Sequence, residues 1–355
     1  MPAKRRSEIS LLNVLFCLIV IFIHIISYAV SAFPAGTVKY TAVMIPWRLA
    51  TFVVQGFVLL SGVKLFLTGK DSVPCRKYIK GRLMGVILPY ALCYILYYIY
   101  YVIMYGYPVF DFSFFFGHFA FGSLTCHFYF IPLLFQFDIL HPLWKGIVNK
   151  FSGIIVIPFA LLFSAMFETY FPTMLNIVFP NLNFVYNDRI FTTYLAFWLI
   201  GCYIGKNYDS FVSLIKKNFS AICAIFAFVL VLCSYFSYLA FNGLAYVPFM
   251  NLLHYIYVVC AIIFLYAVAL KAPKGIFDKV PIIKSIDRAS YHIYLWHMLV
   301  LLITNNLIEA LSITRQSTAF IIRALITYSV TITLCVAYGK LKGTVLERIQ
   351  KKRAV

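Results

Sequence analysis

Charged residues are scarce in this chain. They make up 12% of its 355 residues and include only 11 acidic side chains, whereas 63% of the residues are hydrophobic. Soluble domains average about 25% charged and about 45–50% apolar residues. The composition therefore excludes an ordinary soluble globular protein and predicts a multi-span membrane protein.

Several common motifs are also missing. The chain has no CxxC pair and no HExxH, GxSxG or P-loop pattern. Most of its nine cysteines lie inside apolar runs, which is typical of buried small side chains rather than of a disulfide framework or a zinc site. We therefore expect no metal and no tightly bound cofactor.

Basic residues are in clear excess, with a formal net charge of +19. They fall between the apolar runs, so they indicate membrane topology and anionic lipid rather than nucleic acid. The apolar runs predict an all-α polytopic membrane protein, a single domain over residues 1–355. We place about ten transmembrane helices at residues 9–31, 46–67, 84–105, 123–144, 152–171, 190–205, 219–241, 249–270, 290–309 and 318–339.

The distribution of Lys and Arg predicts that both termini are cytoplasmic, in short basic ends at residues 1–8 and 340–355. Most of the 30 basic residues then lie in inner segments. Lys39, Arg48, Arg189 and Arg315 fall on the outer side. The first apolar run is longer than the core of a signal peptide, so we interpret it as a membrane span.

His24 is the most informative residue of the first span. An ionisable side chain inside a membrane span is a functional candidate by default, and a neutral imidazole can take a proton from a hydroxyl. Asn13 precedes it by three helical turns and so lies on the same face. The alternative is a structural histidine whose ring is satisfied by a neighbouring helix.

Other candidates lie near the span ends. Arg48 could snorkel or face an anionic group. The inner segment that contains Lys80 and Arg82 could bind the phosphates of a cytosolic donor, or could be simple positive-inside anchoring. Asp138 needs a partner within its apolar span, and we expect a basic residue there. Further candidates on the acceptor side are Tyr129, His127 and His297.

Six sequence blocks, in this order, carry a resemblance to a known family. They are residues 20–24 (VIFIH), 56–62 (GFVLLSG), 78–90 (YIKGRLMGVILPY), 127–132 (HFYFIP), 199–205 (LIGCYIG) and 290–297 (SYHIYLWH). Together they cover nearly the whole chain, which resembles the acyltransferase-3 family. Members are integral membrane proteins, mostly bacterial, that O-acylate surface sugars and cell-wall polymers.

The resemblance implies a ten-helix acyltransferase in the plasma membrane. Its members take an acyl group, usually acetyl, from cytosolic acyl-CoA and pass it to a hydroxyl at the outer face. The family's proposed catalytic histidine falls on His24, the first Arg of its RxxR element on Arg82, and the histidine that closes its ninth-span block on His297. Asn13 stands where the family usually has Arg or Lys, and Gly85 stands at the second Arg of RxxR.

The sequence thus predicts an O-acetyltransferase-type enzyme in which His24 acts on the acceptor hydroxyl, assisted by Asn13. Arg82 and Lys80 would contact acyl-CoA, and Arg48 or Tyr129 would orient a glycan acceptor, free or lipid-linked. Two other functions stay open at this point. One is a transporter or flippase for a lipid-linked sugar, and the other is an inactive family member that acts in assembly or sensing.

Overall fold

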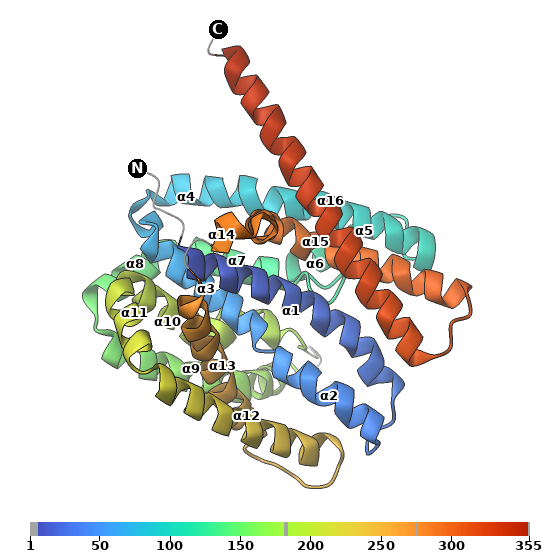
Figure 1. Ribbon diagram of the computed structural model, residues 1–355, viewed down its shortest axis with the longest axis horizontal. Coiled ribbons are helices and arrows are strands. Elements are labelled where there is room, and N and C mark those ends of the chain that lie inside the picture. Colours follow the sequence, from blue (N-terminus) through green and yellow to red (C-terminus); the bar gives the residue numbers. More distant parts are fainter. Residues whose placement is uncertain (1–5, 181–183, 274–275, 354–355) are drawn as a thin grey trace. The chain divides into compact units, whose positions relative to one another are not determined.

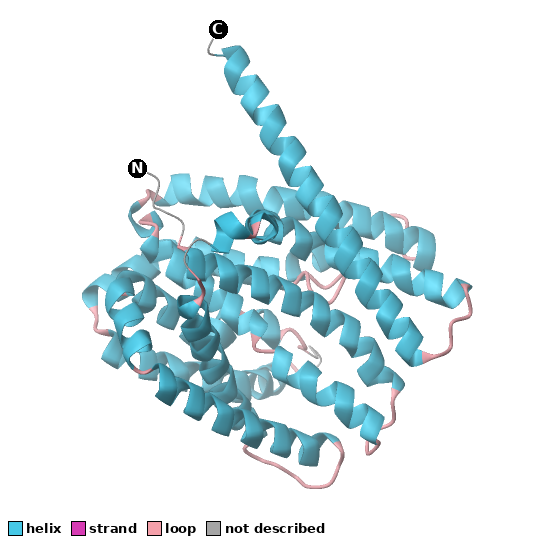
Figure 2. Cartoon of the chain, viewed as in Figure 1, coloured by secondary structure: helices cyan, strands magenta, loops and turns pink. Residues whose placement is uncertain are grey.

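The structure is a computed structural model that describes residues 6–180, 184–273 and 276–353. Within these residues the chain forms helices joined by loops, and no strand occurs (Figure 2). Lys4 and Arg5 of the basic N-terminal end lie outside the described residues. The predicted all-α class is confirmed.

The helices form two compact units. The first combines residues 1–53 with residues 213–355, and the second holds residues 54–212. Helix α11, Tyr208–Lys217, spans the division between them.

The first unit is centred on α1, Ser7–Ala32. Glu8 lies in its first turn, where a carboxylate favours the helix dipole, and Pro34 follows its C-cap residue Phe33. Helix α1 packs against four others and runs beside α15 and α16 (Figure 1). These partners are α2 (Val38–Ala50), α13 (Met250–Lys271), α15 (Pro281–Ala310) and α16 (Gln316–Arg353). The unit also contains α12 (Phe219–Phe241), which packs on α13 and α2, and the short α14 (Ile276–Lys279).

The second unit begins with α3, Val53–Leu67. A short turn at Lys70–Ser72 leads into α4 (Cys75–Arg82), a π-helical segment at Leu83–Ile87 and α5 (Leu88–Tyr105), which form one continuous helical stretch. The remaining helices are α6 (Phe112–Phe121), α7 (Phe130–Ile139), α8 (His141–Lys150), α9 (Gly153–Val178) and α10 (Leu195–Lys206). Two 3-10 turns, Asn187–Arg189 and Phe191–Tyr194, precede α10.

Gly122 sets the path of the chain between α6 and α7. Its φ of +59° is a left-handed conformation, and a Cβ there would lie 2.6 Å from backbone atoms of Phe128 and Tyr129. A glycine is therefore required at this turn, which places residues 127–129 against α6.

Eight of the ten predicted spans correspond to helical stretches long and apolar enough to cross a membrane in the described part of the chain. The other two differ from the prediction. Residues 123–144 form a loop followed by α7 and α8, because Leu140 ends one helix and Pro142 lies in the first turn of the next. Residues 190–205 form a 3-10 turn and the 12-residue α10, which spans only about 18 Å.

Candidate functional site

His24 and His297 lie side by side in the first unit. His24 comes from α1 and His297 from α15, and their ring centroids are 5.2 Å apart. His297 is fully buried, and its Nδ1 lies 3.1 Å from the carbonyl oxygen of Ile293. Nδ1–H therefore donates to this carbonyl, and in the neutral ring Nε2 is the acceptor nitrogen. Because burial and the neighbouring ring both disfavour a positive charge, each ring is expected to be neutral, as a general base must be.

Asn13 contacts a different part of α15. Its Nδ2 donates to Asp287 Oδ1 at 2.9 Å and to Ser290 Oγ at 2.8 Å. Asp287 is only 4% exposed. Eleven residues separate Asn13 from His24, about 16 Å along the helix, so Asn13 does not act directly on that ring. It instead joins α1 to the first turns of α15.

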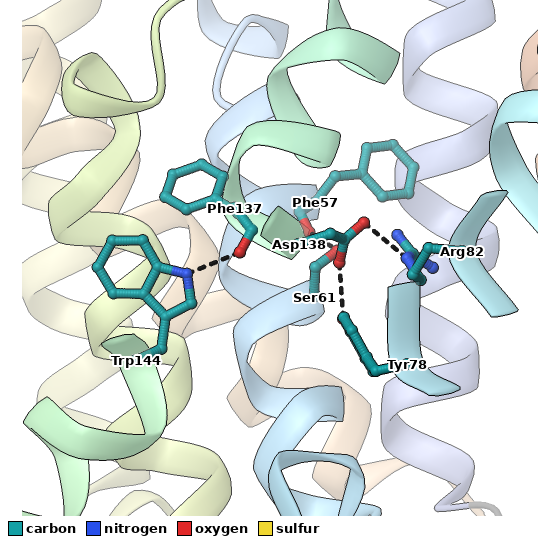
Figure 3. Close-up of polar contacts among 7 residues, drawn as sticks. All are labelled: Phe57, Ser61, Tyr78, Arg82, Phe137, Asp138 and Trp144. Carbon is teal, nitrogen blue, oxygen red and sulfur yellow. Dashed lines mark hydrogen bonds and ion pairs between the residues drawn. The ribbon is translucent and has the colours of Figure 1, made fainter. Parts of the chain in front are cut away.

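Arg82 is held by a buried carboxylate in the second unit (Figure 3). Its Nε donates to Asp138 Oδ2 at 2.6 Å, and the hydroxyl of Tyr78 donates to Asp138 Oδ1 at 2.6 Å. The side chain of Asp138 is 3% exposed and that of Arg82 is 29% exposed. The expectation that Asp138 pairs with a basic residue is confirmed.

One ring contact and two hydrogen bonds to backbone carbonyls hold the residues around this cluster. Tyr78 stacks on His141, with centroids 4.3 Å apart and an angle of 22° between the rings. His141 Nε2 lies 3.0 Å from the carbonyl oxygen of Lys70. Next to Asp138 at the C-terminal end of α7, Trp144 of α8 donates to the carbonyl of Phe137 at 2.7 Å (Figure 3). The guanidinium of Arg82 is thus oriented from one edge, while part of its side chain stays accessible.

Lys80 is not part of this cluster. It is exposed, and two residues along α4 place it on a different face from Arg82. The prediction that Lys80 and Arg82 act together on one donor therefore has no support in their placement.

His127 and Tyr129 precede α7 in the second unit. His127 is 3% exposed and lies among aromatic rings, with Tyr97 at 5.9 Å and Phe128 at 4.5 Å between centroids. Tyr129 is half-buried, and the guanidinium carbon of Arg189 lies 6.0 Å from its ring. His127 is therefore enclosed by side chains, whereas Tyr129 stands beside a cation.

A cavity of about 550 Å³ opens in the same unit. Its lining includes two carboxylates, Asp71 and Asp209, beside Lys206, whose ammonium donates to the carbonyl of Val148. Two carboxylates disfavour the phosphates of a nucleotide. Across the described residues, no group of three or more His, Cys, Asp or Glu side chains could hold a metal ion.

Comparison with known proteins decides the family. Residues 6–340 match the acyltransferase domain family designated acyltransferase 3. The chain belongs to the acyltransferase 3 family. No curated protein and no solved structure matches it. This acyltransferase is a multi-pass membrane protein, as its long apolar helices and its family indicate.

The candidate residues of this acyltransferase divide between the units. His24, Asn13, Arg48 and His297 belong to the first, and Lys80, Arg82, His127 and Tyr129 to the second. Sequence reasoning did not single out Asp287, the partner of Asn13. The only signal was a carboxylate near the start of a predicted span, which needs a partner just as Asp138 does.

Proposed function

We propose that this protein transfers an acyl group, in the simplest case acetyl, from cytosolic acyl-CoA to a hydroxyl of a surface or cell-wall glycan at the plasma membrane. The observation that carries the proposal is the pair formed by His24 and His297. A pair of neighbouring neutral imidazoles inside a helical membrane unit is suited to general base and general acid steps.

In this mechanism His24 takes the proton of the acceptor hydroxyl while the oxygen attacks the thioester carbonyl. The carbon–sulfur bond then breaks, an ester forms, and the proton passes to the sulfur of CoA, which leaves as the free thiol. His297 lies against His24 and can share the proton during the step. Packing of α1, α15 and α16 around the pair limits the access of water, which would hydrolyse the thioester.

Arg82 has the role of binding the donor. An accessible guanidinium whose orientation is fixed by a buried carboxylate can form paired hydrogen bonds with a phosphate. We assign it to the phosphates of acyl-CoA. Asn13 supports the position of α1 through Asp287.

The decisive experiment follows thiol release from acetyl-CoA by the purified protein in liposomes, with a cell-wall glycan extract as acceptor. We expect release with the wild type and a loss of at least a hundredfold with His24→Ala. His292→Ala is a matched control on α15, where the ring contacts Tyr338 rather than His24. Equal release by wild type and His24→Ala would move the chemistry to another residue, and no release from a series of acyl-CoAs would reject the donor.

A further inference from the structure

Arg48 differs from the other half-buried arginines. Arg82 pairs with Asp138, Arg189 with Asp188, and the Nε of Arg323 donates to Asn305. The guanidinium of Arg48 makes neither a hydrogen bond nor an ion pair within the described residues, and its Nε is buried. Its contact is the ring of Phe241, 5.8 Å from the guanidinium carbon. A cation inside a membrane unit without a counter-charge is costly, so it indicates a missing anion.

His254 adds a second polar atom that lacks a partner. The hydroxyl of Thr51 donates its one hydrogen to the carbonyl of Arg48 at 2.7 Å. The same hydroxyl, 3.2 Å from His254 Nε2, therefore accepts the hydrogen of that nitrogen. Nδ1 of His254 is then the acceptor nitrogen, and it is buried with no hydrogen-bond partner in the described part of the chain.

Three helices of the first unit surround this place. Arg48 lies in the last turn of α2, Phe241 ends α12, and His254 lies in the first turns of α13. Cys233 and Ser237 of α12 are fully buried beside it. Arg48 is close enough to Cys233 and His254 for its charge to interact with both side chains. Within the described residues, no carboxylate hydrogen-bonds or ion-pairs with the guanidinium of Arg48.

The loops before α2 and after α12 contact each other on the N-terminal side of Arg48. The backbone N–H of Gly36 donates to the side-chain oxygen of Asn242 at 2.9 Å, and Thr41 donates to the same oxygen at 3.2 Å. Arg48 lies about 10 Å along the helix from Thr41. Helical side chains tilt toward the helix N-terminus, which directs Arg48 toward these two loops. The basic-residue bias predicts that both loops face outward.

We propose that Arg48 and His254 form a subsite for an anionic group of the acyl acceptor, a phosphate or a carboxylate with a hydroxyl next to it. The guanidinium binds the anion through its terminal nitrogens, and the neighbouring hydroxyl donates to His254 Nδ1. The acceptor is thus an anionic glycan rather than a neutral one. The identity of this ligand as acceptor rests on the proposed function, whereas the anion site itself does not.

The test measures binding without acyl-CoA. The full-length protein is placed in phosphatidylcholine nanodiscs and titrated with glycerol 1-phosphate, with glycerol as the neutral probe, and thermal unfolding is followed. We expect glycerol 1-phosphate alone to raise the midpoint. Arg48→Gln should weaken its apparent affinity at least tenfold, and Arg48→Lys should be intermediate because it keeps the charge but loses the planar fork. His254→Gln should weaken it less than Arg48→Gln does.

Arg315→Gln is the matched control, since Arg315 is an exposed arginine of the predicted outer face. Equal stabilisation of the wild type and Arg48→Gln would overturn the site.

A second arm uses phosphatidylglycerol nanodiscs, because a lipid headgroup carries the same phosphate. Phosphatidylglycerol could abolish the binding of glycerol 1-phosphate and also co-purify with the wild type but not with Arg48→Gln. That result would show that the anion is a lipid, and the acceptor assignment would fail. If the binding of glycerol 1-phosphate is unchanged in phosphatidylglycerol nanodiscs, the assignment of the anion to the acyl acceptor is supported. Anion binding without thiol release from any acyl-CoA would reject the transfer reaction and leave the anion site standing.

Discussion

In the proposed function, Asp138 positions Arg82 and does not itself touch the donor. It receives hydrogen bonds from both Arg82 and Tyr78, and its side chain is almost inaccessible. Hydrogen bonds to charged groups contribute about 1.5–3 kcal/mol each. Because the carboxylate fixes the direction of the guanidinium, its loss should affect the binding of the donor more than the chemical step.

We therefore expect Asp138→Asn to raise the KM for acetyl-CoA about tenfold or more with a small change in kcat. Tyr78→Phe should act in the same direction and more weakly, because it removes one neutral donor from the carboxylate. Initial-rate measurements over a range of acetyl-CoA concentrations separate the two constants. A fall in kcat at unchanged KM would contradict the positioning role.

At this scale the sequence predicted types of residue better than their partners. His24 and His297 were both identified, but their proximity depends on the packing of α1 against α15 across 273 residues of chain. The contact of Asn13 with Asp287 is equally distant in sequence. Such pairs follow from tertiary packing, which a single sequence does not encode locally. The partner type of Asp138 was easier to predict, because a carboxylate inside an apolar run needs a basic or hydrogen-bonding partner in any fold.

Helices α3 and α10 meet backbone to backbone. A Cβ at Gly62 would lie 2.5 Å from the carbonyl oxygen of Trp198, and one at Gly205 would lie 2.5 Å from that of Val63. A Cβ at Gly201 would collide with the carbonyl of Leu59. Small residues permit such close approach of membrane helices.

We expect Gly201→Ala to lower the free energy of unfolding by more than about 3 kcal/mol. The new Cβ would collide with the backbone carbonyl of Leu59, which cannot move aside as a side chain can. Unfolding of the purified protein in detergent, followed by intrinsic fluorescence, measures the loss. Gly146→Ala on α8 is the control, since a Cβ there meets no atom within 4 Å and alanine favours a helix. Similar stability of the two variants would show that the contact between α3 and α10 opens easily.

Hydropathy identified the long helices and missed breaks inside apolar segments. Residues 46–67 read as one span, yet the chain leaves α2 at Thr51 before α3 begins at Val53. Residues 123–144 are divided at Leu140, where Pro142 was the available signal. An apolar run continues through a turn without change of composition, so its average cannot locate the turn.

For the whole molecule, composition was enough to predict a helical membrane protein, and six short blocks were enough to predict its family. Orientation in the membrane stays a prediction based on the basic residues. The candidate residues belong to both units, and no sequence pattern indicated that division. Cys75 and Cys126 offer a direct test of orientation, because both are exposed and they fall on predicted opposite faces.

We expect a membrane-impermeant maleimide to label Cys126 but not Cys75 in intact cells, and to label both in opened membranes. Cys126→Ser and Cys75→Ser assign the signal to each position. Labelling of Cys75 in intact cells would reverse the predicted orientation and place Arg82, the proposed contact of acyl-CoA, on the outer side.

The contact between α3 and α10 also bears on the energy balance of a cell that carries this protein. In the proposed function the donor is bound on one side of the bilayer and the acceptor on the other, so a water-filled path between the two sides would also conduct protons. At Gly62, Gly201 and Gly205 backbone meets backbone, without room for even one Cβ atom. We therefore expect glycine at these positions to help keep the bilayer sealed to protons while the proposed acylation proceeds.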